Sequence, residues 1–154
     1  MAGTVEGIFI ADGATELPRP VEEADAVAGK GLRGDRYFRD GGRGTFYEAD
    51  KIGQDLTLIE AEALELLADE AGITLDPAEA RRNVLVRGIG LNELVGRTFT
   101  VGEVECVGRR LCDPCDHLQK LTQPGVLRGL VDRGGLRADI VNGGRIAVGD
   151  AVRG

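Results

Sequence analysis

The residue types best suited to chemistry gather in one short stretch, residues 111–117 (LCDPCDH). This stretch holds two of the three cysteines and the only histidine of the chain, together with two aspartates. Thiols, imidazoles and carboxylates can act as metal ligands, nucleophiles or proton carriers. Residues 101–107, just before it, alternate like a half-buried strand. We therefore expect the stretch to lie where a strand runs out into a loop, which would hold these groups in place and leave them accessible.

The pair Cys112-x-x-Cys115 is compatible with several kinds of site. A redox dithiol is typical of the start of a helix in a thioredoxin-like βαβ unit, whereas here we predict a strand, a loop and a later short helix. A structural zinc site needs four ligands, and only Cys106 and His117 remain to complete one. Cys106 lies within the predicted strand, where the alternation indicates a small core residue.

Two further uses of the pair remain open. A thiolate is a soft ligand that suits a metal heavier than zinc. A catalytic cysteine needs a base nearby, and His117 lies two residues from Cys115, near enough to lower the pKa of that thiol. Cys115 and His117 are therefore the candidate catalytic residues.

Two other polar segments could serve a site. Residues 29–36 (GKGLRGDR) form a glycine-rich turn with three cations and one carboxylate, without the spacing of a P-loop. This is either a solvated turn in which Asp35 accepts hydrogen bonds from nearby backbone amides, or a loop that receives an anion. Arg81, Arg82 and Asn83 precede a predicted buried strand, so we expect at least one of them at the edge of a pocket. As alternatives, the two arginines could be surface cations and Asn83 could close a turn.

The rest of the chain is expected to be rich in short strands. Its 24 glycines follow no fixed period and separate short apolar runs, which is typical of a compact β-barrel or sandwich. The clearest helix covers residues 60–71 and stops at Gly72, and shorter helical segments are predicted at 76–79, 92–94 and 124–132. Residues 37–53 are expected to form a polar loop. Strands are predicted at residues 4–10, 21–27, 54–59, 84–86, 97–101, 136–141 and 145–152, the last two as a hairpin across the glycines at 143–144.

Composition limits the class of protein. A chain of 154 residues with 42% hydrophobic content is long enough for one domain, which we place over residues 1–154. The net charge of −7 argues against a nucleic-acid partner. No segment approaches the roughly 20 apolar residues that span a bilayer, and the N-terminus lacks a basic stretch followed by an apolar one. The odd number of cysteines does not suit a disulfide framework. We expect a cytoplasmic protein with reduced thiols and no membrane partner.

Six segments in order resemble a MOSC domain, the family named after the C-terminal domain of molybdenum cofactor sulfurases. The resemblance runs from about residue 29 to the C-terminus. The family includes small stand-alone bacterial proteins. It implies a mainly β fold with a few short helices (β-rich α+β), a partly closed β-barrel similar to the barrel domain of pyruvate kinase, and a pocket for a molybdopterin-type cofactor. The segments are GLRGDR at 31–36, LTLIEAE at 56–62, RRNV at 81–84, LVGRTFTVG at 94–102, CDPC at 112–115 and GRIAVGD at 144–150.

The resemblance also implies roles for single residues. The characteristic cysteine of the family matches Cys115, which ligates molybdenum in relatives that carry out reductions. A soft thiolate suits a metal bound to dithiolene sulfurs, and it can equally carry a sulfur atom as a persulfide. Arg36 and Arg82 would supply cations for the phosphate of the pterin, and Asn83 would bind the pterin ring. Cys112 is an extra thiol at the same pocket, which would resolve a persulfide, form a reversible disulfide or simply pack.

Two functions follow from this resemblance. The first is a molybdenum-dependent reductase of N-hydroxylated compounds that receives electrons from a partner reductase. The second is a carrier that holds molybdenum cofactor or a sulfane sulfur on Cys115 and passes it to another protein. The chain has no cysteine-desulfurase region with a lysine-bound pyridoxal phosphate, so a separate desulfurase would have to supply the sulfur. A third possibility is a pocket that has lost its cofactor, which the retained cations argue against.

Overall fold

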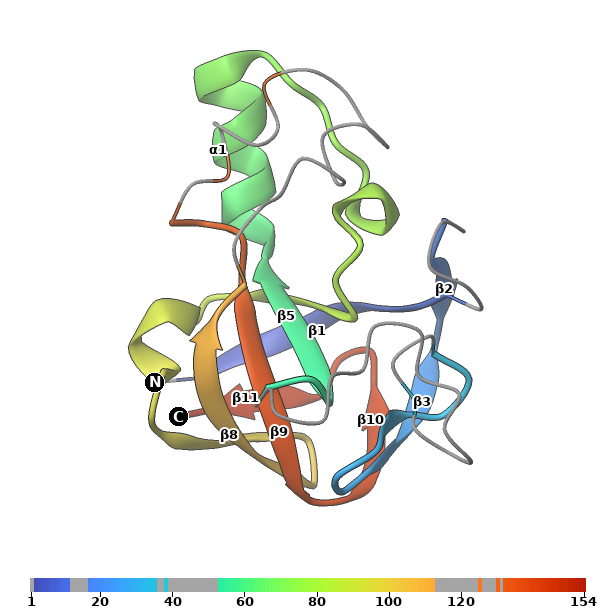
Figure 1. The fold of residues 1–154 in the computed structure, drawn as a ribbon. Helices are drawn as coiled ribbons and strands as arrows, with labels where there is room; N and C mark the ends of the chain where they lie inside the picture. The colour runs from blue at the N-terminus through green and yellow to red at the C-terminus, as the bar shows by residue number, and fades with distance from the viewer. Residues whose placement is uncertain are drawn as a thin grey trace.

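The computed structural model describes residues 2–11, 17–35, 38, 53–112, 125, 130 and 132–154. In these residues the chain is mostly β, as predicted, with one α-helix and two short 3₁₀ turns (Figure 1). None of the described helices is long and apolar enough to cross a membrane. The strands are β1 (Ala2–Ile10), β2 (Arg19–Val21), β3 (Glu23–Val27), β4 (Gly31–Leu32), β5 (Leu56–Glu60), β6 (Val84–Arg87), β7 (Thr98–Val101), β8 (Val104–Leu111), β9 (Leu136–Asn142), β10 (Gly144–Ala147) and β11 (Ala151–Arg153).

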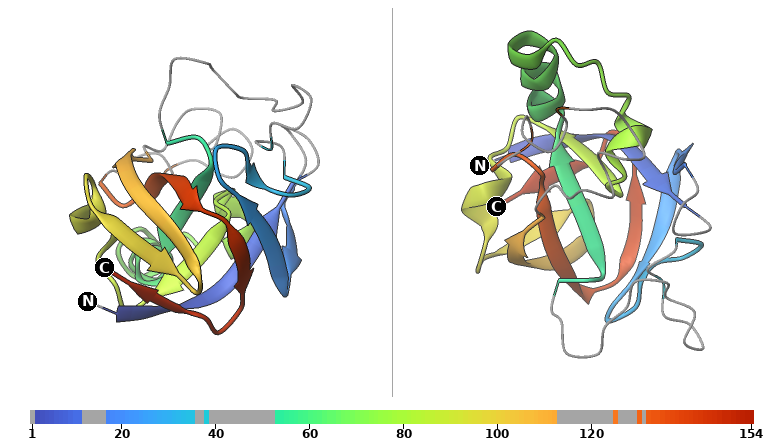
Figure 2. Two further views of the ribbon diagram at one scale, coloured as in Figure 1. Left: turned by 90° about the horizontal axis from the view of Figure 1, so that it is seen from below. Right: turned by 45° about the horizontal axis from the view of Figure 1, so that its top comes forward.

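Seven of these strands close into a barrel (Figure 2). They pair in the order β11-β7-β8-β9-β5-β6-β1, and β1 returns to β11, with Ala2 opposite Arg153. The predicted barrel is confirmed, and because its last strand pairs with its first, these seven strands leave no open edge. β2 continues the sheet beyond β1, and β10, β3 and β4 form a separate three-stranded sheet beside it.

The single parallel pair of the barrel explains where the helix lies. β5 and β6 run parallel, so the chain must cross over between them, and it does so through α1 (Ala61–Ala71) and the 3₁₀ turn η2 (Pro77–Ala80). The predicted stop at Gly72 is confirmed, because this residue caps the helix with a left-handed φ of 67°. The predicted start at residues 76–79 is also confirmed, because Asp76 and Glu79 form a reciprocal capping box.

The described apolar residues bury themselves in two clusters. One fills the barrel and includes Phe99 and Leu136, each no more than 2% exposed. The other lies between α1 and the outer wall of the barrel and includes Leu67, Leu85 and Leu130. Burying one such leucine stabilises the fold by about 1.5–3 kcal/mol. The crossover helix is therefore held against the outside of the barrel by its own apolar stripe.

The first strand is present as predicted, but a bulge interrupts the regular alternation of its side chains. Val5 pairs with Val86 and Gly7 with Leu85, so Glu6 is an extra residue in a β-bulge. A one-residue insertion exchanges the two faces of a strand. As a result Val5 and Ile8 both face the barrel interior, although they lie an odd number of residues apart.

Two other predictions about the strands are corrected. Residues 101–107 are not one strand, because β7 ends at Val101 and β8 starts at Val104 after a turn at Gly102 with φ 59°. Residues 136–152 do not form a hairpin. Both edges of β9 are already occupied by β8 and β5, so β10 pairs with β3 and β11 pairs with β7 and β1.

Of three further predicted segments, one is confirmed and two lie almost wholly outside the described residues. The helical turn predicted at 92–94 is present as η3 (Leu91–Leu94). The polar loop predicted at 37–53 and the short helix predicted at 124–132 fall almost wholly outside the described residues.

Candidate functional site

The cysteine stretch begins where β8 ends, on the side of the barrel from which α1 rises (Figure 1). Leu111 is the last paired residue of β8 and lies opposite Leu136 on β9. The Cys112 N–H donates a hydrogen bond of 2.7 Å to the Gly135 carbonyl, and the residue is only 1% exposed. Cys112 is therefore a fixed point at the stem of the loop. Cys115 and His117 lie outside the described residues, as does Arg36.

Arg82 reaches the same turn from another strand. Its Nε donates a hydrogen bond of 2.8 Å to the Gly134 carbonyl, and its Nη1 donates one of 3.4 Å to the Ala80 carbonyl. The residue is 9% exposed. Within the described part of the chain its Nη2 makes no hydrogen bond and its guanidinium makes no ion pair. A buried cation is costly unless a charged partner offsets it, so this arrangement favours an anion beside Arg82.

The turn that receives both residues is tightly packed. Gly134 and Gly135 are consecutive, so Arg82 and Cys112 bind neighbouring carbonyls of one short segment. A Cβ on Gly135 would lie 2.0 Å from the Leu58 carbonyl oxygen, and its φ of 108° also favours glycine. The backbone of β5 therefore presses directly on this turn. The structure brings two of the predicted residues, Arg82 and Cys112, to one rigid place at the rim of the barrel.

Arg81 lies just before, in an uncommon backbone conformation. It caps η2 with a φ of 60°, and the residue is 7% exposed. Non-glycine residues in the left-handed region cost on the order of 1–3 kcal/mol, and they are concentrated at binding sites. Arg81 and Arg82 are therefore two consecutive buried arginines, in a chain whose net charge is −7.

Asn83 joins three strands at the rim. Its Oδ1 accepts hydrogen bonds of 3.1 Å from both the backbone N–H and the hydroxyl of Thr57, and its Nδ2 donates one of 3.2 Å to the Phe9 carbonyl. The residue is 1% exposed. These bonds hold the end of β1 and the start of β6 against β5, which places Arg82. Contact of Asn83 with a pterin ring stays a prediction.

Sequence reasoning missed Thr57, whose side chain completes this arrangement. Its Oγ1 accepts a hydrogen bond of 2.9 Å from the Asn83 N–H while donating to Asn83 Oδ1. Thr57 is 2% exposed and lies between Leu56 and Leu58 on β5. A buried hydroxyl between leucines was the available signal, because such a group needs a partner.

Sequence reasoning also missed Asp139, whose carboxylate binds both Gly53 and Arg109. Its Oδ1 accepts a hydrogen bond of 2.9 Å from the Gly53 N–H, and its Oδ2 pairs with Arg109 Nε at 2.9 Å. A Cβ on Gly53 would lie 3.1 Å from the Cβ atoms of both Arg109 and Arg137. Gly53, which precedes β5, is therefore held against β8 and β9.

The glycine-rich turn uses its carboxylate for structure. Asp35 is 6% exposed, and its Oδ1 accepts a hydrogen bond of 3.0 Å from the Ala11 N–H at the end of β1. The guanidinium of Arg33 lies over the ring of Phe38, with its carbon 5.5 Å from the ring centre. These contacts agree with the interpretation of residues 29–36 as a turn in which Asp35 binds backbone amides. The alternative of an anion loop depends on Arg36.

The third cysteine belongs to the core, as predicted. Cys106 is fully buried inside the barrel, and burial raises the pKa of its thiol to about 12, helped by the negative charges of Asp55, Glu105 and Asp139. Its side chain belongs to the apolar cluster that fills the barrel, which argues against a zinc ligand at this position. The described residues contain no group of three metal-binding side chains.

Comparisons with known proteins agree on one fold. A family model described as MOSC domain matches residues 33–153. YuaD from Bacillus subtilis superposes with a TM-score of 0.80 at 19% identity, covering 99% of this chain and 94% of that one. YiiM from Geobacillus stearothermophilus has a TM-score of 0.74 at 12% identity, covering 98% and 74%. YiiM from Escherichia coli has a TM-score of 0.70 at 17% identity, covering 99% and 69%. No curated protein matches the sequence.

Proposed function

Because the chain belongs to the MOSC domain family, which is linked to molybdenum cofactor binding, we propose that it binds this cofactor through the Cys115 thiolate. We propose further that it is a reductase of N-hydroxylated compounds that works with a separate electron-donor reductase. The observation that carries the proposal is that Arg82 and Cys112 bind the neighbouring carbonyls of Gly134 and Gly135.

The described residues fit an anionic group that also prefers sulfur ligands. Arg82 is held by two carbonyls, and its Nη2 has no hydrogen bond within the described residues, so a donor remains for a phosphate. Cys112 fixes the start of a loop that carries a second thiol three residues later. A guanidinium for the phosphate and a thiolate for the metal are the two kinds of ligand that a molybdopterin needs.

The reaction needs electrons that this chain does not supply. Reduction of an N-hydroxylated compound breaks the N–O bond, takes up two electrons and two protons, and releases the oxygen as water. When bound, the cofactor supplies the metal that accepts the electrons from the donor reductase and passes them to the substrate. The chain would hold that metal through Cys115, with His117 favouring the thiolate form, and would orient the phosphate through Arg36 and Arg82.

The test is the metal and pterin content of the purified protein. Wild-type chain, Cys115→Ser and Cys112→Ser are produced in a molybdenum-replete host and isolated under identical conditions. We expect about one molybdenum per chain in the wild type and in Cys112→Ser, and none in Cys115→Ser, because only Cys115 would ligate the metal. Equal molybdenum in all three proteins would contradict the proposal.

A carrier of sulfane sulfur is the second candidate, and the nearby Cys112 thiol favours it because a second thiol can resolve a persulfide. In that case wild-type protein contains cyanide-labile sulfur and no molybdenum. The labile sulfur is lost in Cys115→Ser, and a cysteine desulfurase restores it only to chains that keep this thiol.

A further inference from the structure

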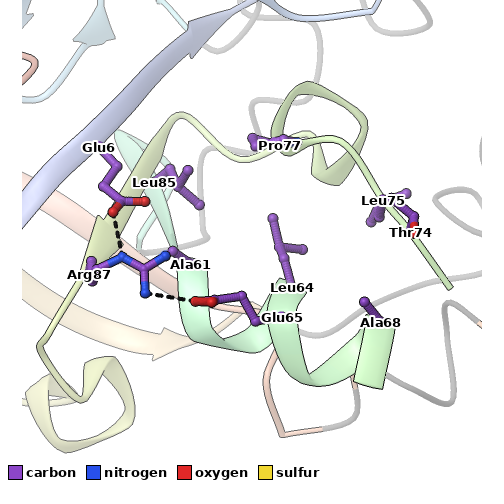
Figure 3. Close-up of a pocket in the computed structure, with 10 residues that line it drawn as sticks. All are labelled: Glu6, Ala61, Leu64, Glu65, Ala68, Thr74, Leu75, Pro77, Leu85 and Arg87. Atoms are coloured by element: carbon purple, nitrogen blue, oxygen red, sulfur yellow. Dashed lines mark hydrogen bonds and ion pairs between the residues drawn. The ribbon is translucent and has the colours of Figure 1, made fainter. Parts of the chain in front are cut away.

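A concave site lies on the outside of the barrel, between α1 and the segment that follows it (Figure 3). Its volume is about 270 Å³, near the lower end of the range of roughly 300–1,000 Å³ that small-molecule pockets occupy. It contains none of the residues predicted for the cofactor. Its apolar lining comes from α1, β6 and the segment between them, namely Ala61, Leu64, Ala68, Leu75, Pro77 and Leu85.

One wall of this pocket carries an excess of negative charge. Arg87 Nε pairs with Glu6, and Arg87 Nη1 pairs with Glu65 Oε1 at 2.7 Å (Figure 3). The hydrogen bonds that Arg87 donates to Glu6 and then to Glu65 raise the pKa of Arg87, so its guanidinium stays charged. Two carboxylates against one guanidinium leave one negative charge. The Oε2 atom of each carboxylate makes no hydrogen bond within the described part of the chain, so acceptors remain beside the apolar surface.

The backbone is shaped to place one of these carboxylates. Glu6 is the extra residue of the β1 bulge, between Val5 and Gly7. β-Bulges change the direction in which a side chain points, and they are common beside active sites. Without the insertion, the side chain would follow the regular alternation of the strand. With it, the carboxylate meets Arg87, which ends β6, and lies at the pocket wall.

We propose that this pocket binds a small amphipathic cation, a short apolar body that carries one protonated amine. The apolar body contacts Leu64, Leu75 and Leu85, and the ammonium donates hydrogen bonds to Glu6 and Glu65. Arg87 is a positioning residue here, because it fixes the two carboxylates from different elements side by side. The excess negative charge selects an amine over a carboxylate of the same shape.

The experiment compares three probes with one chain length and different head groups. Hexylammonium, hexanol and hexanoate are titrated into ¹⁵N-labelled full-length protein, and amide shifts are followed by two-dimensional NMR. We expect hexylammonium to shift amides of residues 61–68 and 85–87 with millimolar affinity, hexanol to bind several-fold more weakly, and hexanoate not to bind. Tighter binding of hexanoate, equal binding of all three probes, or no shifts at these residues would overturn the proposal.

Matched variants locate the site. Glu65→Gln should weaken hexylammonium about three- to fivefold, since a half-exposed carboxylate contributes modestly. Asp69→Asn makes the same charge change on the same helix outside the pocket, and it should leave the affinity unchanged. Ala68→Phe should abolish binding by filling the cavity. If that variant does not fold, the affinities of Glu65→Gln and Asp69→Asn for hexylammonium decide alone. Equal effects of the two substitutions would refute the assignment.

Discussion

Two arginines flank the same strand, and the protein treats their charges in opposite ways. Arg82 precedes β6, is 9% exposed and bonds only carbonyl oxygens among the described residues. Arg87 ends β6, is exposed and lies between Glu6 and Glu65. The chain itself offsets the charge of Arg87. The charge of Arg82 is held in place by neutral groups, which keeps it available for an anion from outside.

This contrast separates two kinds of site on one barrel. The rim around Arg82 is built by close backbone approaches and buried hydrogen bonds, so it is rigid and cationic. The outer pocket around Arg87 is lined by aliphatic side chains with an exposed ionic wall, so it is adaptable and slightly anionic. Substitutions at the rim should have the largest effects, because its packing leaves the least room for change.

The largest effect is expected at the turn that joins Arg82 to Cys112. Gly135→Ala places a Cβ 2.0 Å from the Leu58 carbonyl oxygen, so it should lower the free energy of unfolding by about 3 kcal/mol or more, or prevent folding. Gly96→Ala is the control, because Gly96 also has a positive φ of 79° but nothing within 4 Å of its Cβ. Urea unfolding measures both variants. Similar losses would show that φ alone matters and that the rim is not tightly packed.

The next effect distinguishes the two arginines directly. Arg82→Met leaves the buried Gly134 and Ala80 carbonyls without their donor, and it should cost about 1–3 kcal/mol of unfolding free energy. Arg87→Met removes only exposed ion pairs, and its unfolding midpoint should match that of wild type. Equal unfolding midpoints for the two variants would contradict the claim that Arg82 contributes more to stability than Arg87.

A smaller effect concerns a thiol whose charge the barrel suppresses. The raised pKa of Cys106, about 12, means that the folded state keeps a proton which the unfolded chain loses above about pH 8.5–9. Stability from this group is therefore complete below that pH and falls as the pH rises toward 12. Between pH 8 and pH 10 wild type should lose about 1.4 kcal/mol more than Cys106→Ala in urea unfolding. Parallel losses would mean that this thiol ionises freely in the folded protein.

Local patterns predicted the elements that depend on neighbouring residues. The helix over α1 ends at Gly72 because only glycine easily takes the φ found there, and the capping box of Asp76 and Glu79 is visible in four letters of sequence. At least one of Arg81, Arg82 and Asn83 was expected at a pocket edge because polar residues come just before a buried strand, and the structure buries all three.

Long-range pairing could not be predicted in the same way. The closure of β1 on β11 joins residues 2–4 to 151–153, and nothing in either segment specifies the other. The hairpin expected after Asn142 failed because β9 already has a partner on each edge. The bulge at Glu6 and the bond between Thr57 and Asn83 depend on the register between strands, which alternation alone does not reveal.

The measurement that tests the account most directly is the molybdenum and pterin content of Arg82→Gln beside Arg87→Gln. Both changes remove one positive charge from an end of β6, and both proteins are compared as folded, purified chains. The account predicts that Arg82→Gln loses bound cofactor while Arg87→Gln retains the wild-type amount. Retention in Arg82→Gln, or equal loss in the two variants, would contradict the claim that the rim keeps its charge for an anion beside the cysteine loop.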